Sequence, residues 1–415
     1  MYMNKTKIST VKTTNRKTRK NIIETASDVL SVVVNDKLVT KASHKVLTTP
    51  NISNMKEYAT LISITAERLT ARSKSFTPSI NKRLKSISNE EYTDIFGCDA
   101  ENVLNKTITS TEFNIRIGDV KDVWKSKCVP ATSSQARDVF MKNFKLNKPL
   151  DPLNIIVPMQ SHSNCWFNTM FMCFFVSDKG RKFMRFFRQI MIEGKLLNGK
   201  LIEPPELSKA FILFNAAIEA CYNNGIVRDT DWLALNTNNI IGNIYNSISE
   251  KKINHGGLSN IYQSGNPYNY YQYIMKYLDA GKNAVHMEKY EKTPDVMLFF
   301  NSKKINKRGT PDIIVIDILK PEKFTNKQIK VNYNGAIYEL DSVIIRDDKK
   351  KHFCCGLRCN SVEYLFDGAA FSKLQRRPWR NLINQDYNWR MGGHINHSVW
   401  NFMNGYMMLF YYRIK

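Results

Sequence analysis

Hydrophobic residues follow a helical period in the middle of the chain and a strand-like period towards its end. Cys165 begins a long apolar stretch that predicts a helix to about Ile192, and three- and four-residue spacing predicts further helices over Leu207–Tyr222 and Asn269–Leu278. Short β-branched or aromatic runs follow, separated by Lys, Asn, Gly and Asp, a pattern typical of antiparallel strands. The predicted strands are Val296–Phe300, Asp312–Ile318, Ile337–Arg346, Phe353–Arg358, Glu363–Phe366 and Tyr406–Arg413. Helices followed by a sheet predict an α+β domain.

The first 150 residues carry a weaker pattern, with apolar residues at helical spacing over Ile22–Leu47 and Lys56–Arg72. We expect a mostly helical extension there, in which residues 1–20 are flexible. Proline and polar residues over Asn147–Pro152 favour a break in the fold. The chain therefore divides into an N-terminal extension, residues 1–150, and a main domain, residues 151–415.

Positive charge is concentrated in the extension. The whole chain has 61 Lys and Arg against 37 Asp and Glu, a formal charge of +24, and residues 1–150 hold 26 against 14, which leaves +12. A field of this sign attracts polyanions, so nucleic acid or an anionic membrane surface is an expected partner of the extension. A lysine-rich surface that only aids solubility is an equally open interpretation. Arg16–Lys20 has the composition of a nuclear address.

The cysteines and the apolar runs bear on the compartment. Eight cysteines are scattered along the chain without the paired spacing of a disulfide framework, which favours a reducing compartment. They include no C-x-x-C pair of the kind that zinc ribbons use, and we predict neither a metal nor a cofactor. The longest apolar run, Met170–Val176, is too short to cross a bilayer. We therefore expect an intracellular protein, cytoplasmic or nuclear, without a membrane span.

Cys165, His352 and Asp367 form the strongest candidate for catalytic chemistry. Cys165 follows a polar turn and begins a predicted helix, and a helix N-terminus favours the thiolate form of a cysteine. A cysteine nucleophile also needs an imidazole to take its proton and a third group to orient that imidazole. His352 begins one predicted strand and Asp367 ends the next, so a hairpin would bring them to the same edge of a sheet.

Several segments resemble the sequence boxes of the ubiquitin-specific proteases, and they occur in that family's order. The first, Gln-Ser-His-Ser-Asn-Cys-Trp-Phe-Asn-Thr, resembles the family's cysteine box. The later segments resemble a helix of the type Gln-Glu-Phe-Leu, the histidine box and a closing aromatic strand. In chain order the segments are Gln160–Thr169, Tyr271–Asp279, Tyr338–Val343, His352–Phe353, Tyr364–Asp367 and Gly405–Arg413.

The resemblance covers about residues 153–415 and implies a papain-like cysteine protease fold, with a helical lobe beside an antiparallel sheet. It assigns the nucleophile to Cys165, the general base to His352 and the orienting carboxylate to Asp367. Gln160 and Asn164 are the residues expected at the oxyanion hole. The implied activity is that of a deubiquitinase, a thiol-dependent isopeptidase that cleaves after the Gly-rich tail of ubiquitin or a ubiquitin-like modifier. Conjugates of these modifiers are the expected partners.

The chain departs from the family pattern at four points. His162 and Asn164 replace a Gly and a Thr before the cysteine, Lys351 replaces a Gly before the histidine, and Gly368 stands where a second acid or amide is usual. The zinc-bearing fingers are also missing. Since the fingers and the loops around the site grip the body of ubiquitin, these departures leave the triad but put ubiquitin itself in question as the substrate.

Other interpretations stay open on the sequence alone. His394 and His397 compete with His352 for the role of base, and ovarian-tumour-type deubiquitinases have such a histidine near the C-terminus. The Asn-Cys-Trp core also resembles calpain-type proteases. His162 either lines the cleft or caps a turn. A papain-like protease that processes precursor polyproteins of a large virus is an alternative, as is an inactive basic protein, bound to a virion or to nucleic acid, that retains the fold.

Overall fold

The structure is a computed structural model that describes residue 98 and residues 112–415 with gaps. The described ranges are 112–118, 126–146, 149–222, 235–248, 258–278, 287–291, 310–318, 326–333, 335–347, 351–370, 373–390, 399–403 and 405–415. The predicted helices Ile22–Leu47 and Lys56–Arg72, the flexible residues 1–20 and the predicted strand Val296–Phe300 lie outside these ranges. The predictions for the basic extension therefore stay predictions for most of its length.

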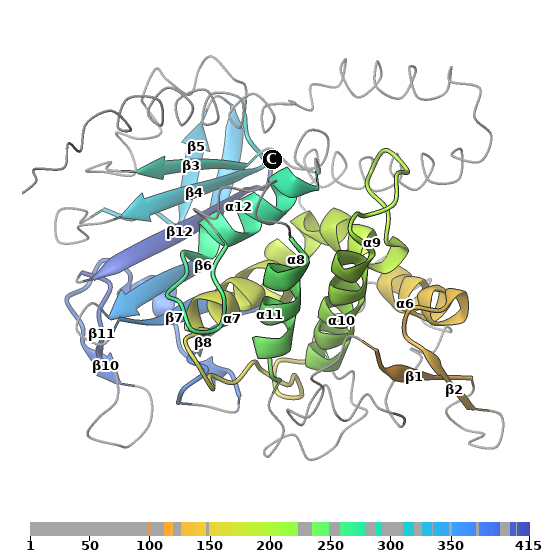
Figure 1. Cartoon of the computed structure of the whole chain (residues 1–415). Coiled ribbons are helices and arrows are strands. Elements are labelled where there is room, and N and C mark those ends of the chain that lie inside the picture. The colour runs from red at the N-terminus through yellow and green to blue at the C-terminus, as the bar shows by residue number, and fades with distance from the viewer. Residues whose placement is uncertain are drawn as a thin grey trace, which may run out of the picture.

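Helices form one side of the molecule and a sheet forms the other (Figure 1). The combination agrees with the predicted helical lobe plus a mainly antiparallel sheet. The helices are α6 (Ser134–Leu146), α7 (Cys165–Phe171), α8 (Gly180–Phe183), α9 (Arg185–Glu193), α10 (Pro205–Tyr222), α11 (Asn238–Ser247), α12 (Pro267–Tyr277) and, on the far side of the sheet, α14 (Trp379–Leu382). A π-helical segment, η3 (Met172–Val176), follows α7 directly.

The single helix predicted from Cys165 to Ile192 is wrong, because the chain breaks at Ser177. Ser177 has an extended backbone (φ −62°, ψ 150°) and ends η3. Its hydroxyl donates to the carbonyl of Cys173 at 2.7 Å and accepts the N–H of Gly180 at 3.1 Å, so it competes with continued helical hydrogen bonding. A Cβ at Gly180 would lie only 1.9 Å from the Cys173 carbonyl oxygen, so this tight turn requires glycine.

Within the described ranges, the main sheet has eight strands in the order β3-β4-β12-β6-β7-β8-β9, with β5 also paired to β6. All neighbouring strands are antiparallel except β3 and β4, which are parallel. The strands are β3 (Met287–Glu291), β4 (Ile313–Ile318), β5 (Lys330–Tyr333), β6 (Ala336–Asp347), β7 (His352–Cys359), β8 (Val362–Phe366), β9 (Gln375–Arg376) and β12 (Tyr406–Arg413). The predicted strands over residues 312–366 agree with β4, β6, β7 and β8 within one or two residues, and β12 has the predicted bounds.

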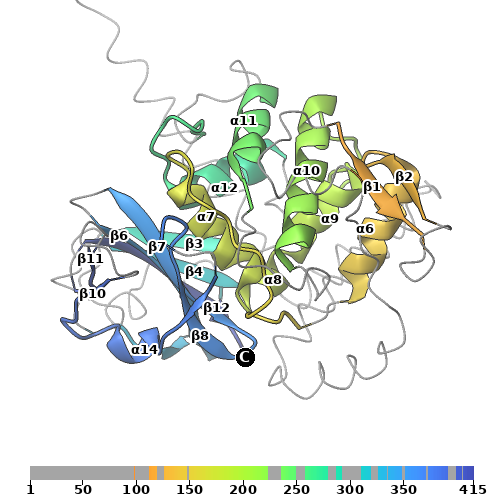
Figure 2. The same ribbon diagram turned by 90° about the horizontal axis from the view of Figure 1, so that it is seen from below.

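Both faces of the main sheet are covered, and alternate residues of a strand enter different cores. On β12, Met408 and Phe410 pack with the helices, whereas Met407 and Leu409 pack on the opposite face. A small two-stranded sheet, β10 (Trp389–Arg390) with β11 (Val399–Trp400), contributes aromatic residues to the second core. Figure 2 shows α7 between the sheet and the remaining helices. The helix that begins at Cys165 is therefore at the centre of the molecule.

The described part of the extension shares the core of the helical lobe. It forms the hairpin β1 (Asn114–Ile117) and β2 (Lys127–Pro130) and the helix α6. Phe140 and Phe144 of α6 belong to the same hydrophobic cluster as α7, and the Arg185 guanidinium lies 4.2 Å from the centre of the Phe144 ring. The boundary expected over Asn147–Pro152 stays a prediction, but the hydrophobic core is continuous across it.

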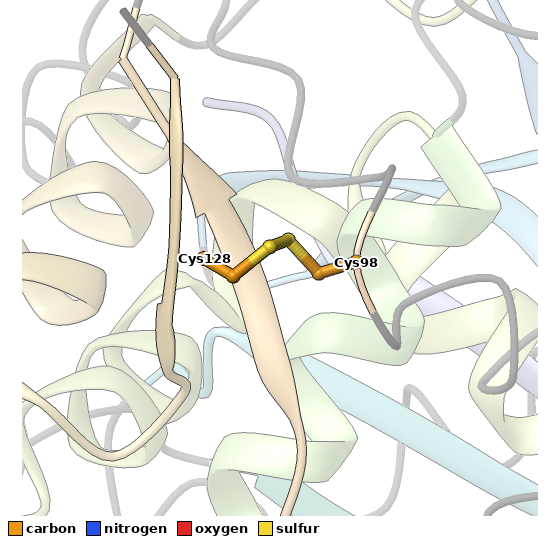
Figure 3. The surroundings of a disulfide bond; sticks show 2 residues. All are labelled: Cys98 and Cys128. Carbon is orange, nitrogen blue, oxygen red and sulfur yellow. A yellow bond between two sulfur atoms is a disulfide. The ribbon is translucent and has the colours of Figure 1, made fainter.

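A disulfide joins Cys98 to Cys128 of β2, with the two Cα atoms 6.0 Å apart (Figure 3). The sequence pattern favoured reduced thiols, so this bridge departs from that expectation for two of the eight cysteines. The scattered spacing could not reveal it, because the bridge spans 30 residues and depends on where β2 lies in the fold. The other six cysteines have free thiols and are buried.

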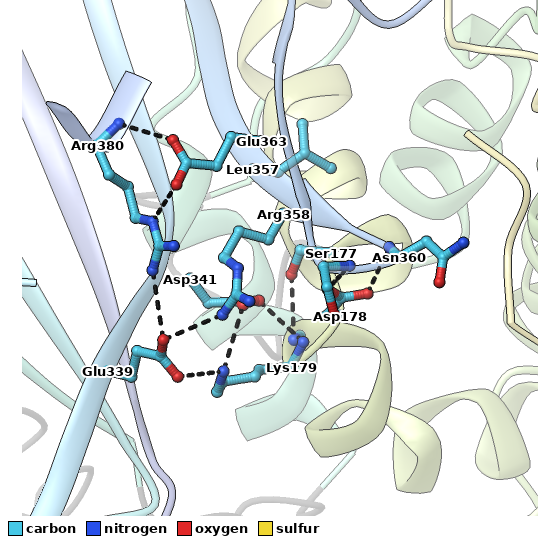
Figure 4. Close-up of polar contacts among 12 residues, drawn as sticks. Ser177, Asp178, Lys179, Glu339, Asp341, Leu357, Arg358, Asn360, Glu363 and Arg380 are labelled. Carbon is cyan, nitrogen blue, oxygen red and sulfur yellow. Dashed lines mark hydrogen bonds and ion pairs between the residues drawn. The ribbon is translucent and has the colours of Figure 1, made fainter. Parts of the chain in front are cut away.

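An ion-pair cluster connects the end of η3 to the sheet (Figure 4). The carboxylate of Glu339 on β6 accepts from Lys179 Nζ at 2.8 Å, from Arg358 Nη1 at 3.1 Å and from Arg380 Nη1 at 3.3 Å. The backbone N–H of Lys179 also donates to buried Asp341 at 2.8 Å. These contacts fix the turn after η3 against β6 and β7. In the part of the chain that the structure describes, no helix is long and apolar enough to span a membrane.

Candidate active site

Three elements bring Cys165, His352 and Asp367 together. Cys165 is the first residue of α7, His352 is the first residue of β7, and Asp367 directly follows β8. Antiparallel pairing of β7 with β8 places the start of the first strand beside the end of the second, as the sequence predicted. His352 Nε2 lies 2.7 Å from Asp367 Oδ1. Because a carboxylate only accepts, Nε2 carries the proton in this contact.

The second ring nitrogen of His352 is left for Cys165, whose side chain is near enough to raise the pKa of the imidazole. Burial on its own would lower the pKa of His352, but the hydrogen bonds to Asp367 and Cys165 outweigh burial and raise this pKa to about 9. All three side chains are largely shielded, with Cys165 and His352 each 8% exposed and Asp367 3% exposed. The site therefore favours a protonated imidazole beside the sulfur at neutral pH.

Backbone contacts around Asp367 hold both the carboxylate and the turn before the cysteine. Asp367 Oδ1 also accepts the N–H of Ala369 at 2.9 Å, which fixes the carboxylate. The carbonyl of Gly368 accepts the N–H of Gln160 at 2.8 Å. A Cβ on Gly368 would lie 2.9 Å from the carbonyl oxygen of Pro158, so the backbone approaches too closely for a larger residue. The Gly that departs from the family pattern therefore has a packing role here.

Gln160 and Asn164, the residues expected at the oxyanion hole, differ in their surroundings. The side-chain Oε1 of Gln160 is buried and has no hydrogen-bond partner among the described residues, and its backbone N–H donates to the carbonyl of Gly368. The side chain of Asn164 is 0% exposed, and its Nδ2 lies 3.1 Å from Thr237 Oγ1 and 2.9 Å from Asn238 Oδ1. The amide donors of Asn164 thus already have acceptors inside the protein.

Thr237 and Asn238, at the start of α11, were not singled out by the sequence. Thr237 Oγ1 donates to Asn168 Oδ1 of α7 at 2.5 Å, and Asn238 Nδ2 donates to Ser161 Oγ at 2.6 Å. With Asn164 they form a polar network that holds the turn before Cys165 from behind. Nothing in the local sequence marks this role, because the partners lie 69 to 77 residues apart.

The competing histidines have different outcomes. His162 is exposed, and its Nδ1 lies 2.9 Å from Asn238 Nδ2, with the ring edge-on to the exposed Tyr262 at a centroid distance of 6.0 Å. The described contacts of His162 are with these two side chains, and the imidazole lies at the protein surface. His394 and His397 lie outside the described residues.

Burial affects the pKa values of three further thiols. Burial raises the pKa of Cys354 and Cys355 well above the ordinary value and raises that of Cys359 to about 12, so these three thiols stay protonated. Within the described ranges, no group of three or more His, Cys, Asp or Glu side chains is arranged to hold a metal ion.

Comparison with known proteins yields matches to solved structures only. No family model matches the chain, and no curated protein matches it. The Ubp8–Sgf11–Sus1–Sgf73 SAGA DUB module bound to monoubiquitin matches with a TM-score of 0.38 and 9% identity, over 96% of this chain and 98% of that chain. The same module bound to ubiquitin aldehyde matches with a TM-score of 0.38 and 11% identity, over 89% and 98%.

These matches are to deubiquitinase modules, at a low level of structural similarity. A third structure of the module matches with a TM-score of 0.37 and 9% identity, over 98% of this chain and 99% of that chain. None of the three bears on a viral source or on nucleic-acid binding.

Proposed function

We propose that the protein is a thiol-dependent peptidase in which Cys165 is the nucleophile, His352 the general base and acid, and Asp367 the orienting carboxylate. The observation that carries the proposal is the placement of His352 beside both partners: its Nε2 lies 2.7 Å from Asp367 Oδ1, and the Cys165 side chain is near enough to raise the pKa of the imidazole. The arrangement has the parts that a cysteine nucleophile requires.

In the proposed reaction, the imidazole of His352 takes the thiol proton and the Cys165 sulfur attacks the carbonyl carbon of the scissile amide. The resulting oxyanion accepts hydrogen bonds from the amide of Gln160 and from backbone N–H groups at the start of α7, since the first turn of a helix leaves such donors without intrahelical acceptors. Asn164 acts by holding the turn, because its side-chain donors are already engaged.

The tetrahedral intermediate collapses when His352 protonates the leaving amine, and the carbon–nitrogen bond breaks to leave a thioester on Cys165. Water then attacks the thioester, His352 takes its proton, and the second intermediate releases the carboxylic acid and the free thiol. Asp367 keeps Nε2 protonated throughout, so that the nitrogen facing Cys165 exchanges the proton.

The proposed substrate class is a conjugate of ubiquitin or of a ubiquitin-like modifier, cleaved after the Gly-rich tail. The order of the sequence boxes supports this choice. The low solvent exposure of Cys165 also suits an extended chain of small residues at the point of attack. The absence of zinc-bearing fingers from the sequence pattern favours a modifier that is gripped mainly by its tail.

Electrophilic probes built on ubiquitin and on several ubiquitin-like modifiers test the proposal. The wild-type chain is expected to form an adduct on Cys165, located by mass spectrometry of peptides. Cys165→Ala should abolish the adduct, and His352→Ala should slow its formation by several orders of magnitude, roughly 10³-fold or more. Cys221→Ala, which removes a buried thiol of α10, should leave the adduct unchanged.

Two outcomes would contradict this function. No adduct with any modifier probe, combined with rapid labelling of Cys165 by a small alkylating agent, would point to another peptide substrate, such as a precursor polyprotein. No preferential reactivity of Cys165 towards either reagent would remove the enzyme proposal altogether and favour an inactive protein that retains the fold.

A further inference from the structure

The hairpin β10–β11 lies beside the proposed catalytic imidazole. Trp400 of β11 is 1% exposed, and the centroid of its ring lies 5.4 Å from that of His352, with the two planes at 47°. Neither the sequence boxes nor the triad accounts for this contact, because β10 and β11 lie between the box that ends at Asp367 and the closing strand β12.

Neighbouring residues fix Trp400 in this place. The N–H of Val399, the preceding residue, donates to Asp347 Oδ2 at 3.1 Å. Asp347 is the cross-strand partner of His352 in the β6–β7 pair, so the hairpin is attached to the strands that present the imidazole. Trp389 of β10 packs against Trp400, with the two ring centroids 5.9 Å apart and the ring planes at 32°. The indole of Trp400 is therefore held between His352 and an aromatic cluster.

The imidazole then has defined neighbours on each side. Its Nε2 contacts Asp367, Cys165 is near enough to raise its pKa, and the indole of Trp400 packs against the ring itself. An aromatic ring within about 6 Å attracts a cation through its quadrupole, and tryptophan does so most strongly. A neutral imidazole gains no such attraction. Trp400 thus favours the protonated form of His352. It also blocks rotation of the imidazole away from Cys165 and Asp367.

We propose that Trp400 is a positioning residue, which holds the His352 imidazole between Cys165 and Asp367 and favours its protonated form. The inference rests on the proposed thiol chemistry at Cys165. The ionisable groups that face His352 from the described elements are Cys165 on α7, Asp347 on β6 and Asp367 after β8, and Lys351 precedes it in the chain. Trp400 differs from all of them because it carries no charge and acts through its ring.

The test compares Trp400→Leu and Trp400→Phe with the wild type in two measurements over pH 5 to 10. One is the alkylation rate of Cys165 by iodoacetamide, which reads the thiolate without needing a substrate, and the other is kcat/KM on the modifier conjugate that labels best. Loss of the indole should lower the pKa of His352. The high-pH limb of kcat/KM should therefore move to lower pH by roughly half to one unit in Trp400→Leu. Trp400→Phe should shift in the same direction by less.

Trp379→Leu is the matched control. Trp379 is a fully buried tryptophan of the same aromatic cluster whose indole N–H donates to the Leu357 carbonyl at 3.2 Å. Its loss should lower the unfolding midpoint comparably without moving the pH limb. Should Trp400→Leu fail to fold, the smaller shift of Trp400→Phe carries the test.

The outcomes separate the inference from the function on which it rests. An unmoved limb in both folded Trp400 variants, or an equal shift in Trp379→Leu, overturns the role of Trp400. A wild-type protein in which Cys165 shows no enhanced alkylation at neutral pH refutes the proposed thiol chemistry itself, whatever the variants do.

Discussion

Replacing Asp367 by asparagine isolates the charge next to His352. Asparagine keeps an oxygen that can accept from His352 Nε2 and from Ala369, so the hydrogen bonds and the tautomer survive while the negative charge is lost. In the wild type, the pKa of His352 is raised to about 9 from an ordinary value of 6.5. That rise corresponds to about 3 kcal/mol of preference for the imidazolium.

Without the carboxylate charge, burial still lowers the pKa of His352 while the main opposing interaction is weakened. Removal of an opposite charge at this distance typically lowers a pKa by about one to three units, and we expect a fall of roughly two. The ratio of the thiolate–imidazolium pair to the neutral pair then falls about 10²-fold. The kcat/KM of Asp367→Asn should fall by up to that factor, with its high-pH limb moved towards acid.

Stability gives an independent measure with a definite sign. Because folding raises the pKa of His352, its contribution to the free energy of unfolding is fully present below about pH 6.5 and is lost as the pH rises through 9. Wild type should therefore lose on the order of 3 kcal/mol from this group between pH 6 and pH 10. Asp367→Asn should lose much less over the same interval.

Urea denaturation at pH 6 and pH 10, together with the pH profile of Cys165 alkylation, checks both expectations. Glu206→Gln, a change at an exposed acid of α10, serves as the control for general charge effects and should match the wild type. If Asp367→Asn kept the wild-type limb and the wild-type loss of stability with pH, the assignment of Asp367 as the partner of His352 would be refuted.

Three further changes have defined outcomes. Asn238→Ala should lower the free energy of unfolding by about 1–3 kcal/mol, seen in urea denaturation, because buried Asn164 loses an acceptor. Glu339→Ala should lower the free energy of unfolding by about 3 kcal/mol. Burial would raise the pKa of Glu339, but its cationic neighbours lower it. The stability difference between wild type and this variant should therefore shrink as the pH falls below about 4.5. Gly368→Ala should reduce kcat more than stability, because its Cβ would press on Pro158 and displace Gln160; an unchanged kcat would contradict the close approach.

The strands around the site could be predicted from sequence because their pattern is local. β7, β8 and β12 are short runs rich in apolar residues between clear turn signals, and their bounds were predicted within two residues. The proximity of His352 and Asp367 followed from hairpin geometry alone. The break at Ser177 could not be predicted, because a side-chain hydroxyl and a close glycine interrupt a stretch whose hydrophobic pattern continues to Ile192.

Contacts between distant segments were beyond the reach of sequence patterns. Thr237 and Asn238 support the turn before Cys165 from more than 70 residues away, and Trp400 reaches His352 from a hairpin that lies between the box ending at Asp367 and the closing strand β12. Asn164 lies next to the nucleophile in the sequence, yet its amide faces the protein interior. The side-chain donors of Asn164 therefore have partners inside the protein, and its place at the oxyanion hole stays a prediction.

The ion-pair cluster at Glu339 has a consequence for how activity could be lost. The nucleophile belongs to the helical lobe, whereas the imidazole and its carboxylate belong to the sheet, and the segment that carries Cys165 meets β6 and β7 again at Lys179. A sliding of one lobe over the other by an ångström or two would separate sulfur from nitrogen while every hydrogen bond inside each lobe survived. Inactivation of this kind would leave the circular dichroism spectrum intact, so a folded but unreactive preparation would be diagnosed by its thiol and missed by its secondary structure.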